Sequence, residues 1–170
     1  SVHSLWSNGE ICLFVDDGSL KQLNANYSPS TLLTGLNSSR MQFVEVGGVV
    51  YFCNDTIVGY IEEGVSYPLP DPGQTFKQRM IGGQILEYYH GRLYSAQDDT
   101  IFYSDAMALS RMDTRKNFIQ LSGWISMLKA VANGLYVSAG EYVYFMTGLD
   151  PGDFGIVRVT DCPAIEGSAI

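Results

Sequence analysis

The sequence predicts an all-β fold that is β-propeller-like, with about four repeats of four antiparallel strands. The chain has 170 residues, among them 11 Tyr, 8 Phe, 2 Trp and 18 Gly. Aromatic residues favour strands, and glycines favour the tight turns between strands. Apolar runs and turns also recur at a regular spacing. Together these observations favour a repeated β structure over a helical or disordered chain.

The repeat is clearest over residues 85–105. Three short runs rich in Ile, Leu, Tyr and Phe are separated by the turn His90-Gly91 and by a polar turn that ends at Asp99. Short apolar runs between turn residues are typical of consecutive antiparallel strands. The same pattern occurs near residues 44–61 and 129–146, and more weakly near residues 5–20.

The spacing of the copies can be counted from their tyrosines. Tyr51, Tyr94 and Tyr136 are 43 and 42 residues apart, and another aromatic residue follows each of them nine residues later. A period of about 40–43 residues with four strands is typical of propeller blades, and we favour it over an ordinary meander that happens to repeat. Repeated aromatics could stack sugars, but we favour packing between sheets. The predicted repeat-core residues are Tyr51, Tyr60, Tyr94, Tyr103, Tyr136 and Phe145.

Each blade is assigned in order along a single domain that covers residues 1–170. Three prolines after residue 67 cannot continue a strand ladder and mark a linker. Residues 74–83 form a connector without an assigned structure, and 106–116 a short helix or long loop. The approximate blades are 1–39, 40–73, 82–123 and 124–162, and 163–170 start a further strand or close the ring. The expected strands are 2–6, 10–15, 19–23, 31–33, 41–46, 49–53, 57–61, 65–67, 85–89, 92–96, 100–104, 117–121, 125–131, 135–138, 142–146 and 156–160.

An open propeller leaves unpaired edges that invite further pairing. Closure of the ring by residues 163–170, pairing with another copy, and membership of a larger propeller in a longer protein are the three alternatives. We favour the last.

The turns themselves carry paired acidic or amide side chains. Paired carboxylates could hold Ca²⁺, but no D-x-D-x-D spacing with a distal Glu is present. Asp and Asn in hairpin turns satisfy local backbone donors, so we predict turns and no metal site. The predicted repeat turns contain Gly9, Gly48, Gly91, Gly134, Asp17, Asp55 and Asp99.

The chain carries 18 acidic and ten basic residues, which give a formal net charge of −8. An acidic surface repels phosphate backbones, so no strong nucleic-acid binding is expected, although such a surface could line a passage through which DNA slides. No apolar run is long enough to span a bilayer, so no membrane partner is expected.

Catalytic and metal motifs are absent from the sequence. His3 and His90 lie in no metal-binding pattern, and no nucleophile elbow, Walker loop or dinucleotide fingerprint occurs. We therefore predict neither an enzyme nor a cofactor. Paired acids for glycoside hydrolysis would not show as a sequence motif, so an enzyme is left as the third alternative. Cys12, Cys53 and Cys162 lie far apart, with Cys12 aligned to Tyr51 in the repeat, and we interpret them as buried reduced thiols.

Seven segments carry a further pattern. They are residues 3–6 (HSLW), 43–52, 56–61, 89–94 (YHGRLY), 101–104, 134–137 (GLYV) and 163–169. These segments are similar to uncharacterised virion proteins of bacteriophages and prophages. The resemblance implies a β-propeller at the neck or tail of a phage particle, and it carries over no catalytic residues. Members of that family are longer at both ends and often have an extra domain near residues 68–83.

The expected function is that of a structural bacteriophage virion component, a head–tail neck or tail assembly module that acts through protein–protein contacts. Its partners would be other virion proteins or further copies in a homo-oligomer. Its location would be the virion, assembled in the host cytoplasm. The alternative is a carbohydrate- or receptor-binding β-propeller module.

Overall fold

The computed structural model describes residues 1–169 of the chain. Within this range the chain forms four four-stranded antiparallel sheets and one two-stranded sheet. In each large sheet the strands follow one another in chain order, and each pairs with the preceding strand of the same sheet. The all-β, propeller-like fold predicted from the sequence is therefore confirmed. None of the helices in the described part of the chain is long and apolar enough to cross a membrane.

Blades 1 and 2 each consist of four consecutive strands joined by short turns. Asp17 and Gly18 both have positive φ in the β2–β3 turn, the backbone that a two-residue hairpin with the right twist requires. Blade 1 contains β1 (Val2–Ser7), β2 (Cys12–Asp16), β3 (Ser19–Leu23) and β4 (Pro29–Leu33). Blade 2 contains β5 (Gln42–Val46), β6 (Val49–Cys53), β7 (Val58–Glu62) and β8 (Val65–Pro68).

Blade 3 carries an insertion between its third and fourth strands. It contains β10 (Ile85–Tyr89), β11 (Arg92–Gln97), β12 (Thr100–Tyr103) and β14 (Phe118–Gln120). Inside the insertion, β13 (Arg111–Asp113) pairs with β9 (Lys77–Arg79), which precedes the blade. Of the two alternatives predicted for 106–116, the short helix is wrong and the long loop is correct except for β13, because β9 supplies a ladder partner that no local pattern reveals.

Blade 4 completes the series. It contains β15 (Ile125–Val131), β16 (Gly134–Ala139), β17 (Tyr142–Thr147) and β18 (Gly155–Thr160). A short 3₁₀ turn, η1 (Pro151–Asp153), precedes β18, and the Asp150 side chain accepts a hydrogen bond from the Gly152 N–H at its start. The remaining described residues, 161–169, form an extended tail without strands.

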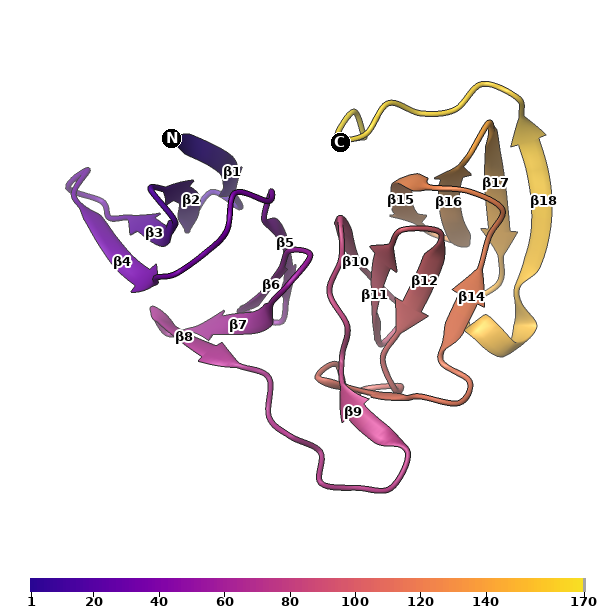
Figure 1. Cartoon of the computed structure of the whole chain (residues 1–170), viewed down its shortest axis with the longest axis horizontal. Coiled ribbons are helices and arrows are strands. Elements are labelled where there is room, and N and C mark those ends of the chain that lie inside the picture. The colour runs from indigo at the N-terminus through magenta and orange to yellow at the C-terminus, as the bar shows by residue number, and fades with distance from the viewer. Residues whose placement is uncertain (170) are drawn as a thin grey trace.

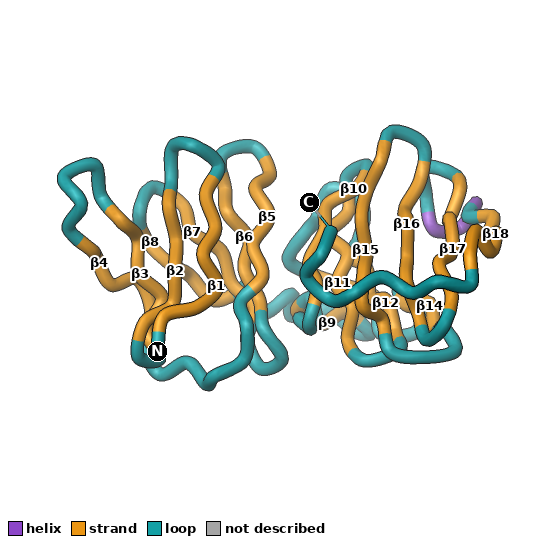
Figure 2. Tube along the Cα trace, turned by 90° about the horizontal axis from the view of Figure 1, so that it is seen from above, coloured by secondary structure: helices purple, strands orange, loops and turns teal. Residues whose placement is uncertain are grey.

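The blades are arranged as an open arc (Figure 1). The first strands of the blades, β1, β5, β10 and β15, line the concave side, and the last strands lie on the outer side. Blade 1 and blade 4 lie at opposite ends of the arc, and the tail returns from β18 to the concave side. From above, the strands of each blade run side by side between two layers of turns (Figure 2).

Three hydrophobic cores hold the arc together, one between each pair of consecutive blades. Leu13 and Val50 belong to the first core, Cys53 and Leu93 to the second, and Tyr94 belongs to the third. Blade stacking, not a single central core, therefore stabilises the chain.

Candidate functional site

Each blade has two faces. The forward face is the one directed toward the next blade in chain order, and the backward face is the one directed toward the previous blade; the forward face of blade 4 and the backward face of blade 1 are defined by the same register. In an antiparallel ladder, directly opposed residues point to the same side of the sheet. One such row crosses the forward face of each blade. The rows are Trp6–Leu13–Gln22–Ser30, Val44–Tyr51–Tyr60–Tyr67, Glu87–Tyr94–Tyr103 and Lys129–Tyr136–Phe145–Val157.

Inside the arc these rows are interblade packing. Tyr94 is fully buried between blades 3 and 4, and its ring centroid lies 5.9 Å from that of Tyr103 and 6.4 Å from that of Phe154. Burial raises the pKa of the Tyr94 hydroxyl. In blade 2, the Tyr51 and Tyr60 centroids are 6.1 Å apart, and both rings pack against the second core. Four of the six predicted repeat-core residues thus lie between blades.

The forward row of blade 4 has no blade in front of it. The rings of Tyr136 and Phe145 contact each other at a tilt of 34°, with centroids 4.6 Å apart. Both are only half-buried, and neither packs against any of the three cores formed by the described residues. Val157, in the same row, is 57% exposed. Blade 4 therefore shows solvent the kind of face that blades 2 and 3 bury.

Blade 1 shows the complementary face. Cys12 and Leu23 are directly paired on its backward side, with Phe14 on the same side. By register, Cys12 and Leu23 occupy the positions that Val50 and Ile61 occupy in blade 2. The side chains of Cys12, Phe14 and Leu23 are half-buried. On the edge of this face, Lys21 Nζ lies 2.9 Å from Asp16 Oδ2.

The alignment of Cys12 with Tyr51 is therefore wrong by one residue. Leu13, which is fully buried, occupies the forward position in blade 1. The four-residue stretch 8–11 joins β1 to β2, whereas blade 2 joins its first two strands through the pair Gly47-Gly48. The paired positions are nevertheless equally far apart in both blades, since Trp6 pairs with Leu13 and Val44 with Tyr51. The shift arises because Gly9 stands three residues after Trp6 whereas Gly48 stands four after Val44, so a repeat aligned on the two glycines is one residue out, which moves a side chain to the other face.

The tail lies along the upper edge of blade 4. The Ala164 N–H donates to Ser138 Oγ at 2.9 Å, and Ser126 Oγ donates to the Ala164 carbonyl at 2.8 Å. Trp124 Nε1 donates to Glu166 at 3.1 Å. Residues 163–169 form neither a strand nor a contact with blade 1 that closes the ring, and Ile170 lies outside the described residues.

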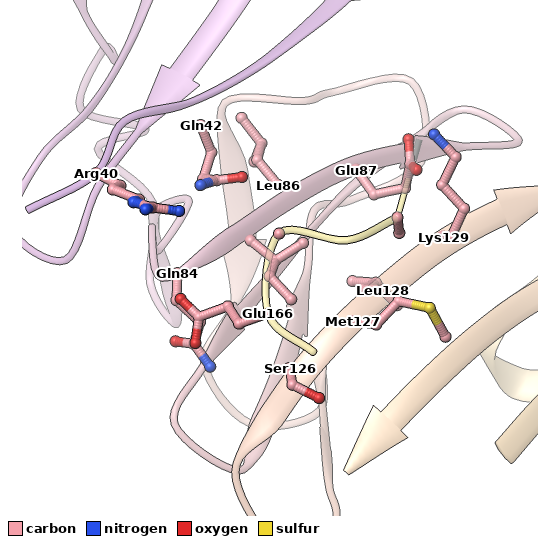
Figure 3. Close-up of a pocket in the computed structure, with 13 residues that line it drawn as sticks. Arg40, Gln42, Gln84, Leu86, Glu87, Ser126, Met127, Leu128, Lys129 and Glu166 are labelled. Carbon is pink, nitrogen blue, oxygen red and sulfur yellow. The ribbon is translucent and has the colours of Figure 1, made fainter. Parts of the chain in front are cut away.

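A small pocket of about 140 Å³ lies on the concave side of the arc. It is lined by the first strands of blades 2, 3 and 4 and by the tail (Figure 3). Arg40 and Glu166 lie toward one end, and Glu87 and Lys129 toward the other. Glu87 Oε2 accepts the Ala130 N–H at 3.2 Å, which links blade 3 to blade 4. The pocket is thus polar and of mixed charge.

A partly buried ion cluster fastens the blade 3 insertion. Asp105 accepts hydrogen bonds from Lys77 at 2.6 Å, Asn117 at 3.0 Å and Arg111 at 3.1 Å. Burial alone would raise the pKa of Asp105, but these donors outweigh it and lower that pKa. Hydrogen bonds from Arg115 likewise lower the pKa of Asp113. Every acidic group of the cluster is paired, so the cluster has a structural role.

Most predicted turn residues lie in turns. Gly9, Gly48 and Gly91 have positive φ, as does Asp17. Asp55 accepts hydrogen bonds from Asn37 and Ser39, and Asp99 accepts them from Thr100 and Gln120. Residues 1–169 contain no group of three or more His, Cys, Asp or Glu side chains that could hold a metal ion.

Gly134 is the exception among the predicted turn residues. It is the first residue of β16, and a Cβ there would lie 2.3 Å from the Met146 carbonyl oxygen. Glycine is therefore required by close packing against β17, not by a positive φ.

The cysteines occupy three different environments. Cys53 is fully buried, its Sγ donates to the Gly83 carbonyl at 3.6 Å, and burial raises the pKa of the thiol to about 12. Cys12 is half-buried, and Cys162 is exposed. The prediction of buried thiols is confirmed for Cys53 and wrong for Cys162.

Comparisons with known proteins establish the fold. No protein-family model matches the chain, and no curated protein does. Among solved structures, the computationally designed Ika8 protein superposes with a TM-score of 0.60 at 14% identity, covering 97% of this chain and 51% of that one. The computationally designed Ika4 protein gives 0.58 at 13% identity, covering 94% and 92%. This chain thus spans about half the length of the Ika8 chain and nearly all of Ika4.

Proposed function

We propose that the chain is a structural module of a bacteriophage particle, at the head–tail neck or in the tail, and that it acts through protein–protein contacts. One observation carries the proposal. The forward face of blade 4 and the backward face of blade 1 have the pattern of interblade interfaces, yet no blade covers either face.

The chemistry of blade 4 supports a protein partner. Two aromatic rings in contact, beside aliphatic side chains, give a large apolar contact area, and exposed apolar patches of this kind mark protein interaction sites. Aromatic residues are enriched at the centres of protein interfaces.

The phage assignment rests on the similarity of short segments, such as residues 3–6 and 43–52, to virion proteins. The net charge of −8 is compatible with it. A neck or tail component surrounds DNA that must move without sticking, and an acidic surface repels phosphates.

Purified particles test the proposal. A tagged chain, expressed in the cells that carry its gene, should sediment with particles and stay bound through a high-salt wash. Phe145→Glu should lower its incorporation at least tenfold, because it places a charge in the outward row. Tyr27→Glu is the matched control, since Tyr27 is 82% exposed in a loop of blade 1.

Recovery of the chain only in the particle-free supernatant would contradict the proposal. In that case a glycan array tests the carbohydrate-binding alternative. Binding that disappears on changing Tyr136 to Ala, and survives Tyr27→Ala, would favour that alternative.

A further inference from the structure

We infer that the two outward faces belong to one interface, and that a second copy of this chain covers both, so that two arcs close head to tail into a single ring. The inference rests on the proposed function, since it names the partner of the same faces. It adds the geometry of that contact, which is blade 4 of each copy on blade 1 of the other.

The faces are of opposite type. Within the chain, the forward row of one blade always packs on the backward side of the next blade, as Tyr94 of blade 3 packs toward Leu135 of blade 4. The arc has one unused forward face, at blade 4, and one unused backward face, at blade 1. A head-to-tail contact therefore repeats an arrangement that the chain already makes three times.

The forward face of blade 4 repeats the chemistry of a buried row. Tyr136 and Phe145 stand at the positions of Tyr51 and Tyr60 in blade 2, and of Tyr94 and Tyr103 in blade 3. In blade 3 this pair fills the wedge between two sheets, and its first ring is fully buried. The same wedge in front of blade 4 has the rings but no opposing sheet.

The backward face of blade 1 offers the opposing surface. Cys12, Phe14 and Leu23 supply apolar side chains at positions where blade 2 uses Val50, Phe52 and Ile61 against blade 1. On the first strand, Val2 is 68% and Leu5 is 76% exposed. First strands of neighbouring blades lie side by side on the concave side (Figure 1), so these two residues would meet β15 of the second copy.

The tail follows the course expected of a chain that leads toward another blade. It crosses the top of blade 4 through Ala164, much as the connection from blade 1 to blade 2 is held where the Met41 N–H donates to Ser4 Oγ at 2.8 Å. The tail then turns to the concave side, where Gly167 lies beside Arg40. It leaves the Tyr136–Phe145 row uncovered.

Closure depends on the curvature of the arc. A head-to-tail interface gives a ring if the rotation closes and an open fibre if it does not. The arc in Figure 1 places its two ends on opposite sides of the concave centre, so that a second arc can complete the circle.

Light scattering on a sizing column tests the inference. The unmodified chain should elute as a single species of twice 18.7 kDa, at the same mass over a hundredfold range of concentration. Phe145→Glu on blade 4 and Phe14→Glu on blade 1 should each give the single-chain mass, and Tyr27→Glu should keep the doubled mass. Thermal melting of each variant verifies that it is folded, and Val157→Glu, on an exposed outer strand, is the substitute if Phe145→Glu unfolds.

Three results would overturn the ring. A single-chain mass for the unmodified protein is the first, and a mass that grows steadily with concentration, as for a fibre, is the second. The third is a doubled mass sensitive to Phe145→Glu but not to Phe14→Glu, which indicates a symmetric contact between two blade 4 faces. If the protein has the mass of a single chain but still binds particles through Phe145, the ring is wrong and the proposed function stands. If it has the doubled mass but does not bind particles, the ring stands and the proposed function is wrong.

Discussion

Blades 3 and 4 carry a tyrosine at the same register position of their forward rows, but only the tyrosine of blade 3 is fully buried. Tyr94 in blade 3 is fully buried against blade 4. Tyr136 in blade 4, at the same register position, packs against Phe145 and is partly exposed to solvent. The strand pattern thus fixes where an aromatic side chain points. The neighbouring blade decides whether that side chain is core or interface.

The two blades also differ in how their third and fourth strands are joined. In blade 3 the connection is fastened by the ion cluster around Asp105. In blade 4 it is held by Asp150, whose carboxylate lies 2.9 Å from Arg92, and by the Tyr89 hydroxyl, which donates to the Gly148 carbonyl at 2.6 Å. Both contacts come from blade 3, so blade 3 organises its own insertion and the loop of its neighbour.

The largest expected effect is a contrast between two identical substitutions. Tyr94→Ala should lower the free energy of unfolding by about 3–5 kcal/mol, because it removes a buried aromatic ring. Tyr136→Ala should cost less than about 1 kcal/mol in the single chain, since its ring is half-exposed. Urea unfolding of the Phe14→Glu background, which we expect to be a single chain, measures both. Tyr94→Phe is the control that preserves volume, and equal losses at the two positions would contradict the distinction.

The ion cluster should make the blade 3 insertion sensitive to acid. The folded pKa values of Asp105 and Asp113 are lowered, so their stabilisation is complete above the unfolded carboxyl pKa near 4 and is lost as the pH falls through the folded values. Asp105→Asn should lower the free energy of unfolding by about 2 kcal/mol at pH 7. The melting temperatures of the unmodified chain and of Asp105→Asn, measured at pH 7, 4 and 2.5, should converge as the pH falls. A constant difference at every pH would contradict this account.

The bond between blade 3 and the loop of blade 4 should have a smaller effect. Tyr89→Phe removes one buried hydrogen bond to Gly148 and should cost about 1 kcal/mol. Urea unfolding measures the loss, and Tyr27→Phe, in an exposed loop, should leave the stability unchanged. A loss below the error of the measurement would show that the Gly148 carbonyl finds another hydrogen-bond donor in the variant.

Thiol labelling distinguishes side chains buried between blades from side chains on outward faces, and it needs no substitution that would change stability. Cys162 should react with a maleimide within minutes, Cys12 more slowly, and Cys53 only after denaturation, because its thiol is buried and its pKa is raised to about 12. Mass spectrometry of the digested protein locates the label. Rapid labelling of Cys53 in the folded chain would contradict the packing between blades 2 and 3.

Local patterns were enough to predict the blades from the sequence. Strand and turn signals lie next to one another in the chain, so the repeats at Tyr51, Tyr94 and Tyr136 could be found by spacing alone. The pairing of β9 with β13 could not, because a connector before the blade meets an insertion inside it. The register of blade 1 failed at Cys12, because Gly9 and Gly48, which look equivalent in the sequence, stand one position apart in their hairpins.

The outward faces could not be predicted from the sequence either. The row of blade 4 has the same residue types as the buried rows, so composition does not distinguish an end blade from an inner one. Only the structure shows that, among the described residues, Tyr136 and Phe145 pack against none of the three interblade cores. The rows of blades 3 and 4 do differ in charge at one position, since blade 4 has Lys129 where blade 3 has Glu87.

One measurement tests the head-to-tail contact most directly. Isotopically heavy and light copies are mixed, unfolded and refolded together, treated with a lysine-reactive cross-linker, and digested for mass spectrometry. Lys129 lies on the forward face of blade 4 and Lys21 on the backward face of blade 1, at opposite ends of one arc. We predict heavy–light cross-links between Lys129 and Lys21. Cross-links that join Lys129 only to Lys129, or no heavy–light link at either residue, would contradict the account.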